Sequence, residues 1–165
     1  MIDGGLVEAA SAVLDLCARH GLKLATAESC TGGLIAAALT ETPGSSRVFE
    51  RGYVTYSNTA KIEDLGVPAE LIDQHGSVSE EVARAMAKGA LKAAGVDLAL
   101  AVTGVAGPDG GTPQKPVGLV YIAAAHSSGT ALGREFRYGK LGRSEIRRRS
   151  ALAALALVTE LIERF

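Results

Sequence analysis

The spacing of apolar residues changes repeatedly along the chain, and each spacing predicts a different kind of element. Apolar positions three and four residues apart predict helices over residues 6–19, 29–39, 58–65, 68–74, 79–95 and 143–165. Short apolar, β-branched or aromatic runs predict strands over residues 22–27, 49–56, 97–103, 117–125 and 130–138. Within the strand predicted at 97–103, residues 98–102 are all apolar, as expected for a strand that is covered on both faces.

Capping residues mark where several of these helices should begin. Ser79 is followed by two glutamates, and this is a favourable helix start because serine caps free N–H groups and acids suit the positive end of the helix. Asn58 is a candidate cap for one short helix. Ser29 or Thr31 is the candidate cap for the helix that follows the first strand.

The order of the elements predicts the fold class. Helices alternate with strands early in the chain, whereas the last two strands are joined only by the short turn Ser127-Ser128-Gly129 and should be antiparallel. This order predicts a single α/β domain over residues 1–165, with three α/β/α layers around a mixed, partly parallel sheet. A chain of 165 residues is long enough to bury such a core. The order of the strands within the sheet does not follow from these patterns.

The bulk composition narrows the possible classes of function. The formal net charge is −1, which argues against a general nucleic-acid or anionic-membrane binder, because such proteins need clustered positive charge. Two cysteines make no disulfide framework, and the N-terminus lacks the basic and apolar segments of a secretory leader. No stretch approaches the roughly 18 consecutive apolar residues of a membrane span. We therefore expect a cytoplasmic protein with no nucleic-acid or membrane partner.

Three segments share one form, in which a strand ends in a polar junction before a helix or loop. They are residues 25–33, 54–61 and 102–108. Ligands of open α/β sheets bind beyond the carboxyl ends of the strands. If these three strand ends lie at one edge of the sheet, four candidate functional residues converge there: Ser29, Tyr56, Lys61 and Thr103.

Ser29 is the candidate nucleophile, at the expected start of a helix. Free backbone N–H groups at that position can bind an anion or a developing oxyanion, and the glycines that follow leave the approach open. We expect Thr31, Gly32 and Gly33 to contact the substrate. The alternative is structural, with Ser29 as a simple cap and glycines that only permit close packing.

A serine nucleophile needs a base, and Lys61 is the candidate. The three histidines stand apart from any such motif. Lysine becomes a base only if its pKa falls from about 10.4 toward neutrality. The helix start contributes less than about one pKa unit, so desolvation must provide most of the shift. Tyr56 is a candidate to relay the proton or hold the serine hydroxyl, although a surface lysine and a core tyrosine would leave the same pattern.

Cys30 is a rival nucleophile, because Glu28, Lys61 and Cys30 match the Glu-Lys-Cys set of another amidase class. The side chains of adjacent residues diverge. If Ser29 points into the site, Cys30 therefore points into the core, where free cysteines usually lie. Ser29 is the preferred nucleophile and Cys30 the alternative.

Two further segments are candidates to hold a ligand. The glycine-rich residues 104–111 fit neither the dinucleotide fingerprint nor a P-loop, but Thr103 and Gly104 can contact a substrate, with a structural turn as the alternative. Arg143 and Arg147, one helical turn apart, form a candidate anion clamp, with a solvated basic face as the alternative. No cluster of metal-ligand residues stands out, so we expect neither a metal nor a cofactor.

Longer motifs make the chain similar to a known family. They are Thr26-Ala27-Glu28-Ser29-Cys30-Thr31-Gly32-Gly33, Val54-Thr55-Tyr56-Ser57-Asn58, Lys61, Gly76-Ser77-Val78-Ser79, Thr103-Gly104-Val105-Ala106-Gly107-Pro108-Asp109-Gly110-Gly111 and Lys115-Pro116-Val117-Gly118. Over about residues 6–160 the chain resembles the CinA C-terminal domain family. That family contains the bacterial nicotinamide-nucleotide amidohydrolases, also called NMN deamidases. Many members carry a larger domain before this one.

The resemblance implies an α/β/α fold, a homodimer or higher homo-oligomer, and hydrolysis of nicotinamide mononucleotide to nicotinate mononucleotide and ammonia in pyridine-nucleotide salvage. It implies no metal or cofactor. The family's serine, tyrosine and lysine correspond to Ser29, Tyr56 and Lys61. Its glycine-rich segment corresponds to residues 103–107, and its arginine-bearing helix start to Arg143 and Arg147.

These residues define a hypothesis for the reaction. Neutral Lys61 takes the Ser29 hydroxyl proton as the oxygen attacks the carboxamide, Tyr56 completes the proton path to ammonia, and water hydrolyses the ester. A non-catalytic nucleotide-binding or regulatory module is the alternative from another class, since the family name derives from competence and damage-induced genes. An amidase for a different amide is the enzymatic alternative.

Overall fold

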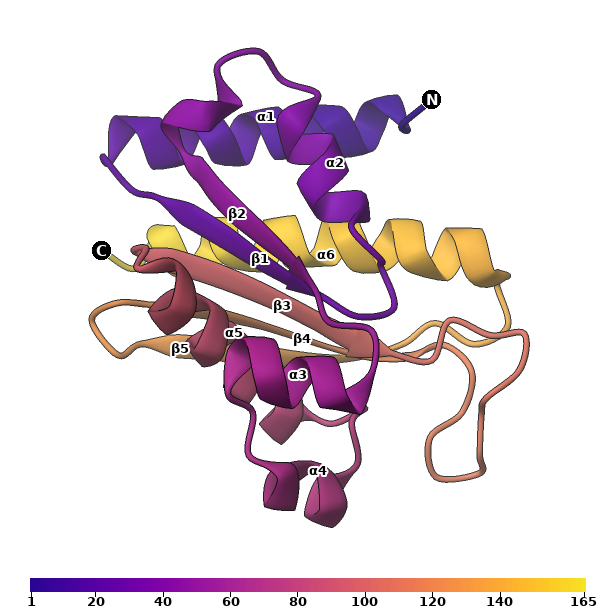
Figure 1. The fold of residues 1–165 in the computed structure, drawn as a ribbon. Helices are drawn as coiled ribbons and strands as arrows, with labels where there is room; N and C mark the ends of the chain where they lie inside the picture. Colours follow the sequence, from indigo (N-terminus) through magenta and orange to yellow (C-terminus); the bar gives the residue numbers. More distant parts are fainter.

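The computed structural model describes residues Met1–Phe165 (Figure 1). In chain order the elements are α1 (Gly4–Arg19), β1 (Leu24–Glu28), α2 (Leu34–Thr40), the short 3-10 helix η1 (Ser45–Arg47), β2 (Phe49–Val54), α3 (Asn58–Leu65), α4 (Ala69–His75), α5 (Glu80–Ala94), β3 (Leu98–Gly104), β4 (Leu119–His126), β5 (Ala131–Arg137) and α6 (Arg143–Ile162). Every predicted helix and strand is present, and η1 was not predicted. The largest difference in a boundary is at the start of α2.

The five strands form one sheet in the order β2-β1-β3-β4-β5. β1 is parallel to both β2 and β3, whereas β4 is antiparallel to β3 and to β5. The parallel strands are connected through helices, and β4 and β5 by a short turn. The predicted α/β/α fold with a mixed, partly parallel sheet is therefore confirmed.

Helices cover both faces of the sheet, with α1, α2 and α6 on one side and α3, α4 and α5 on the other (Figure 1). β3 contributes to the cores on both sides. Its Leu98, Leu100 and Val102 pack with residues of α1 and α6, while Ala99 and Ala101 pack with residues of α5. Alternate residues of a strand point to opposite faces, so a run that is apolar throughout fills both cores, as predicted.

The carboxyl ends of β1, β2 and β3 lie at the same edge of the sheet because these three strands are parallel (Figure 1). Ser29 directly follows β1, residues 55–61 follow β2, and Thr103 and Gly104 end β3. The three polar junctions identified in the sequence therefore meet where α/β sheets bind their ligands.

The junction after β1 differs from the prediction. α2 begins at Leu34, so neither Ser29 nor Thr31 is its N-cap. Gly32 and Gly33 have φ angles of 57° and 95°, and these left-handed values interrupt a right-handed helix and favour glycine. Residues 29–33 consequently form a turn between the strand and the helix, which we call the nucleophile turn after the candidate nucleophile Ser29.

Two helices begin with caps other than those predicted. At α2, the Glu28 carboxylate accepts hydrogen bonds from the N–H groups of Ile35 (2.8 Å) and Ala36 (3.1 Å), which suits the positive end of a helix. At α3, the cap is Ser57, and the predicted cap Asn58 is the first helical residue. The predicted serine cap of α5 is confirmed.

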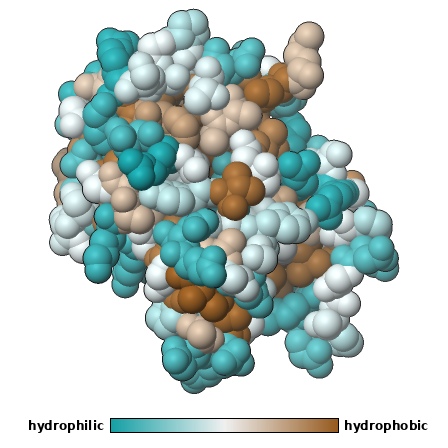
Figure 2. Space-filling view, viewed as in Figure 1, coloured by the Kyte–Doolittle hydropathy of each residue, from teal (hydrophilic) through white to brown (hydrophobic).

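The outer surface visible in Figure 2 is mostly hydrophilic, and its apolar residues gather chiefly between α3 and α4. Val54 and Ile62 are among the exposed apolar side chains. None of the helices combines the length and the apolar character required to cross a bilayer.

Candidate active site

Ser29 and Lys61 meet at the edge of the sheet, 32 positions apart in the chain. The Lys61 Nζ lies 3.1 Å from the Ser29 Oγ. β1 leads directly into Ser29, and Lys61 lies on α3, which follows β2. Both are buried, with Ser29 8% exposed and Lys61 2% exposed. The structure therefore brings an alcohol and an amine within hydrogen-bonding distance in a shielded site, an arrangement suited to a nucleophile and its base.

The surroundings of the Lys61 amine favour its neutral form. Its other partners are two backbone carbonyls, Thr55 O at 3.0 Å and Tyr56 O at 3.3 Å. Burial lowers the pKa of Lys61, because removal from water disfavours the charged amine. A neutral amine can donate its two N–H groups to these carbonyls and keep its lone pair for the Ser29 hydroxyl. The same contacts thus fit a base that is ready to take the serine proton.

A cavity of about 190 Å³ opens beside this pair. Its lining residues are Ser29, Cys30, Tyr56, Lys61, Ser77, Val78, Thr103, Gly104, Ala106 and Arg143. A second cavity of about 330 Å³ shares Ala106 and Arg143 with the first and extends to Lys140. Together they reach the size range of small-molecule sites.

A larger groove of about 750 Å³ follows the glycine-rich segment but contains neither Ser29 nor Lys61. We assign the candidate site to the smaller cavity because Ser29 and Lys61, the candidate reactive pair, both lie in its wall. No group of three or more His, Cys, Asp or Glu side chains is arranged to hold a metal ion.

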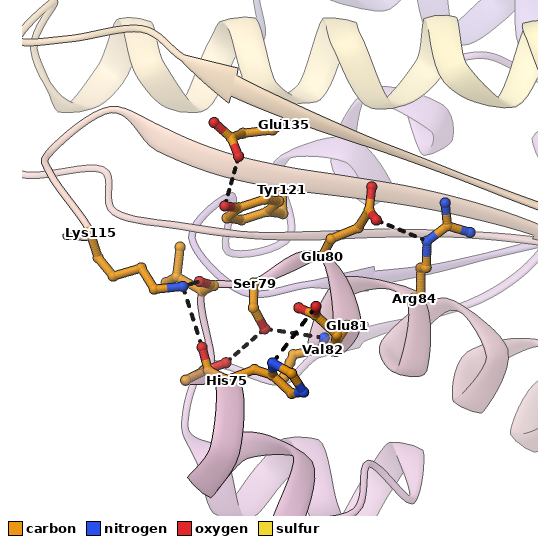
Figure 3. A network of polar contacts seen from close by, with 11 residues as sticks. His75, Ser79, Glu80, Glu81, Val82, Arg84, Lys115, Tyr121 and Glu135 are labelled. Carbon is orange, nitrogen blue, oxygen red and sulfur yellow. Dashed lines mark hydrogen bonds and ion pairs between the residues drawn. The ribbon is translucent and has the colours of Figure 1, made fainter.

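Ser77 and Val78 form part of the cavity wall, and neither was among the predicted site residues. They lie between α4 and α5. Lys115, which follows the glycine-rich segment, donates hydrogen bonds to Val78 O at 2.6 Å and His75 O at 3.3 Å (Figure 3). The Thr103 hydroxyl donates to Ser77 O at 2.8 Å. The motif Gly76-Ser77-Val78-Ser79 marks this segment in the sequence, but only its contacts with the distant Thr103 and Lys115 place it in the cavity wall.

The Tyr56 hydroxyl lies with Arg143 rather than with the reactive pair. Arg143 Nη2 donates to the Tyr56 hydroxyl at 3.0 Å, and Arg143 Nη1 donates to Gly107 O at 2.7 Å. Tyr56 is 60% exposed, and only its backbone carbonyl contacts Lys61. The predicted relay role therefore has no contact between the hydroxyl and Ser29 or Lys61 to support it.

Thr103 and Gly104 both border the cavity at the end of β3. A Cβ on Gly104 would lie 2.7 Å from Val120 Cγ2 and 2.9 Å from Leu119 O. These separations are shorter than real Cβ contacts, so the close pairing of β3 with β4 requires glycine there. The Gly104 backbone is consequently the part of this residue that can meet a ligand.

The remaining predicted contact residues do not line the cavity. Thr31 is completely buried, and neither it nor the two glycines after it line the cavity. The Arg147 guanidinium binds the nucleophile turn, where Nε donates to Cys30 O at 3.1 Å and Nη2 donates to Thr31 O at 2.8 Å. Of the predicted anion clamp, only Arg143 reaches the cavity.

The surroundings of Cys30 make it a poor nucleophile, although it borders the cavity. Burial raises the pKa of Cys30 to about 12, so the thiol stays protonated near neutral pH and little reactive thiolate forms. The Glu28 carboxylate is bonded to the start of α2 and does not pair with Lys61. The geometry thus favours Ser29 over the Glu-Lys-Cys alternative.

Comparison with known sequences identifies the family. The CinA C-terminal domain matches residues 7–162. A CinA-like protein from Geotalea uraniireducens is 54% identical over 145 residues, which are 88% of this chain and 34% of that protein. A CinA-like protein from Mycolicibacterium vanbaalenii is 51% identical over 156 residues, 94% of this chain and 36% of that protein. The chain thus spans about a third of the length of these curated relatives.

Solved structures agree with the sequence match. The competence/damage inducible protein of Agrobacterium tumefaciens is 47% identical with a TM-score of 0.95, and the match covers 98% of each chain. A CinA superfamily protein from Escherichia coli is 32% identical with a TM-score of 0.89, over 94% of this chain and 90% of that chain. By sequence and by fold, therefore, the chain belongs to the CinA C-terminal domain family.

Proposed function

We propose that this protein hydrolyses the carboxamide of nicotinamide mononucleotide to nicotinate mononucleotide and ammonia. The observation that carries the proposal is the 3.1 Å contact between the Ser29 hydroxyl and the buried Lys61 amine. The family resemblance supplies the substrate, and the adjoining cavities give space for the nucleotide beside the reactive pair.

The reaction proceeds in two acyl-transfer steps. The Ser29 oxygen attacks the carboxamide carbon while its proton passes to the Lys61 amine. The C–N bond then breaks, and the leaving nitrogen takes the proton from Lys61 and departs as ammonia. Water attacks the remaining ester, Lys61 accepts the proton of that water, and this proton returns to the Ser29 oxygen as nicotinate mononucleotide leaves.

The negative charge that develops on the amide oxygen needs nearby hydrogen-bond donors. The Cys30 N–H directly follows the nucleophile and donates to no oxygen atom of the protein. In serine hydrolases such a free N–H stabilises the oxyanion, and the loss of one donor slows catalysis about 100- to 1,000-fold. We therefore assign this role to the Cys30 N–H.

Arg143 is the residue that would hold the substrate phosphate. Its guanidinium borders both the reactive cavity and the adjoining cavity, and Lys140 adds a second positive charge to the latter. Guanidinium groups bind phosphate with two parallel hydrogen bonds. A substrate that extends from Ser29 to Arg143 would bridge the two cavities.

A panel of amides tests the substrate assignment. We expect ammonia from nicotinamide mononucleotide and far less from nicotinamide riboside or free nicotinamide, which lack the phosphate. Arg143→Gln should raise KM for the mononucleotide about 10- to 100-fold, the value of one hydrogen bond to a charged group, and leave the riboside rate unchanged. Arg149→Gln, which removes an equal charge on the outer face of α6, serves as the control.

The outcomes of this panel separate the candidate functions. Saturable binding of the mononucleotide without ammonia would favour a non-catalytic nucleotide-binding module. Faster release from another amide would favour a different amidase, and an unchanged KM in Arg143→Gln would refute the phosphate role.

The lowered pKa of Lys61 predicts how activity depends on pH. Because only the neutral amine is a base, kcat/KM should rise with pH to a plateau, with a midpoint below the ordinary lysine value of about 10.4. Ammonia release measured across this range checks the expectation. A midpoint at or above the ordinary value would contradict it.

The free energy of unfolding should also depend on the titration of Lys61. Between the lowered pKa and about 10.4, the unfolded chain holds a proton on Lys61 that the folded chain lacks, so the free energy of unfolding rises with pH. Lys61→Met removes this group and should lose that rise. Urea unfolding of both proteins at several pH values measures the difference, and parallel curves would count against a lowered pKa.

A further inference from the structure

Arg147 makes contacts that neither substrate binding nor the proposed chemistry requires. Its guanidinium donates to Cys30 O at 3.1 Å and to Thr31 O at 2.8 Å, two carbonyls of the nucleophile turn. We propose that Arg147 is a positioning residue, which holds the nucleophile turn so that Ser29 and the Cys30 N–H face the substrate. This inference rests on the proposed role of Ser29 as the nucleophile.

The nucleophile turn needs support from other parts of the fold. It contains two consecutive glycines in left-handed conformation, which are costly to order because glycine is so free in the unfolded chain. Within the turn, the Gly32 N–H donates to Ser29 O, and the Glu28 carboxylate anchors the following helix. The Cys30 and Thr31 carbonyls complete the turn, and Arg147 is the side chain that binds both.

The shape of the guanidinium explains how it fixes the turn. Its planar fork binds two neighbouring acceptors with little loss of freedom for each bond formed. In a peptide unit the N–H points opposite to the C=O, so holding the Cys30 and Thr31 carbonyls sets the orientation of two successive peptide planes. The Thr31 carbonyl shares its peptide unit with the Gly32 N–H, which donates to Ser29 O at 3.0 Å. Ser29 O in turn shares its peptide unit with the Cys30 N–H, so this chain of contacts fixes the backbone of Ser29 and the direction of the Cys30 N–H.

α6 connects this support to the rest of the site. Arg143 and Arg147 lie one turn apart on the same helix, and Arg143 binds the Tyr56 hydroxyl and Gly107 O. The first turns of α6 therefore hold three separate segments around the cavity. The two arginines have different partners, so they should affect different kinetic constants: Arg143 mainly KM and Arg147 mainly kcat.

Labelling of Ser29 by a small fluorophosphonate tests the proposal without the natural substrate. The Ser29 oxygen forms a P–O bond, the P–F bond breaks, fluoride leaves and the hydroxyl proton passes to Lys61. We expect Arg147→Gln and Arg147→Lys to label about 10- to 100-fold more slowly than the natural protein, the scale of a small misplacement of a reacting group. Both should lower kcat for nicotinamide mononucleotide by a similar factor while KM stays within about twofold.

Two comparisons separate positioning from a general loss of structure. Arg148→Gln removes the adjacent arginine, whose partners are Asp3 and Glu145 on the surface, and it should label at the natural rate. Arg147→Ala should regain part of its labelling rate when guanidinium chloride is added below denaturing concentrations. Free guanidinium can restore labelling only in a protein that is folded and lacks only the guanidinium group of Arg147.

Several results would overturn the proposal. Natural labelling rates in Arg147→Gln and Arg147→Lys would exclude a positioning role. A raised KM with unchanged kcat would indicate that Arg147 binds the substrate phosphate instead. A fall in labelling that guanidinium does not restore, with a lowered melting temperature, would indicate a structural role only. If the natural protein labels at Ser29 but releases no ammonia from the mononucleotide, the substrate is wrong while the labelling still decides the role of Arg147. No labelling of Ser29 at all would refute both.

Discussion

Replacing Ser29 with alanine should lower ammonia release from nicotinamide mononucleotide by at least about 10⁴-fold, because the attacking atom is removed and a nucleophile of this kind acts as a unit with its base. The Ser29 Oγ is the only alcohol oxygen bonded to the Lys61 amine. The variant leaves that amine and its two carbonyl partners in place. The loss should therefore appear in kcat, whereas binding of the mononucleotide should change little.

The measurement compares steady-state ammonia release with binding of the mononucleotide by calorimetry. Cys30→Ala is the matched control, because it changes the neighbouring residue in the same turn and removes the rival nucleophile. Its activity should stay within a few-fold of the natural protein, since the buried Cys30 thiol has a pKa near 12 and is not ionised. Near-normal turnover in Ser29→Ala, or a lost activity in a folded Cys30→Ala, would transfer the nucleophile role to the cysteine.

Replacing Lys61 with methionine should slow the reaction about 100- to 10,000-fold, the usual contribution of a positioned base. Methionine has a similar length without an ionisable group, so it fills the buried space that Lys61 occupies. Methionine cannot donate to the Thr55 and Tyr56 carbonyls, which costs about 1–3 kcal/mol of stability, so the melting temperature is measured beside the activity. A loss of activity in a protein that is still folded at the assay temperature would then report on the base itself.

Lys61→Arg separates the charge of Lys61 from its ability to accept a proton. Arginine keeps a positive charge at all accessible pH values and cannot serve as a base, so this variant should be as slow as Lys61→Met. Single-turnover measurements of ester formation on Ser29 would locate the defect in the first chemical step. Substantial activity in Lys61→Arg would mean that positive charge, and not proton transfer, is what the site requires.

For Tyr56, the role expected from the motif differs from the contacts in the structure. Its position five residues before Lys61 made it a candidate to assist the base. In the folded chain it is the backbone carbonyl that contacts the Lys61 amine, while the hydroxyl accepts a hydrogen bond from Arg143. The end of a strand fixes the backbone position of a residue, whereas the direction of a long aromatic side chain depends on the residues that pack around it. Those neighbours come from α6, which the local pattern around Tyr56 cannot reveal.

The start of α2 shows a similar limit. Serine and threonine are favourable N-caps, so a helix beginning near Ser29 or Thr31 was a reasonable expectation. The left-handed glycines interrupt the helix, and the carboxylate of Glu28 caps it from the end of β1. Helix propensities describe single residues and their immediate neighbours. They therefore missed a cap from Glu28, whose side chain binds the N–H of Ile35 seven residues later.

The chain's own pattern of residues was sufficient to predict the helices, the strands and the mixed sheet, and to select Ser29 and Lys61 as the candidate pair. These features depend on apolar spacing and on short motifs, which are local properties. Only the tertiary structure decided the order of the strands, the burial of Lys61, the cavity wall formed by Ser77 and Val78, and the different partners of Arg143 and Arg147. They depend on which distant segments pack together. Helical spacing places Arg143 and Arg147 on one face of a helix, but it does not determine which residues that face contacts.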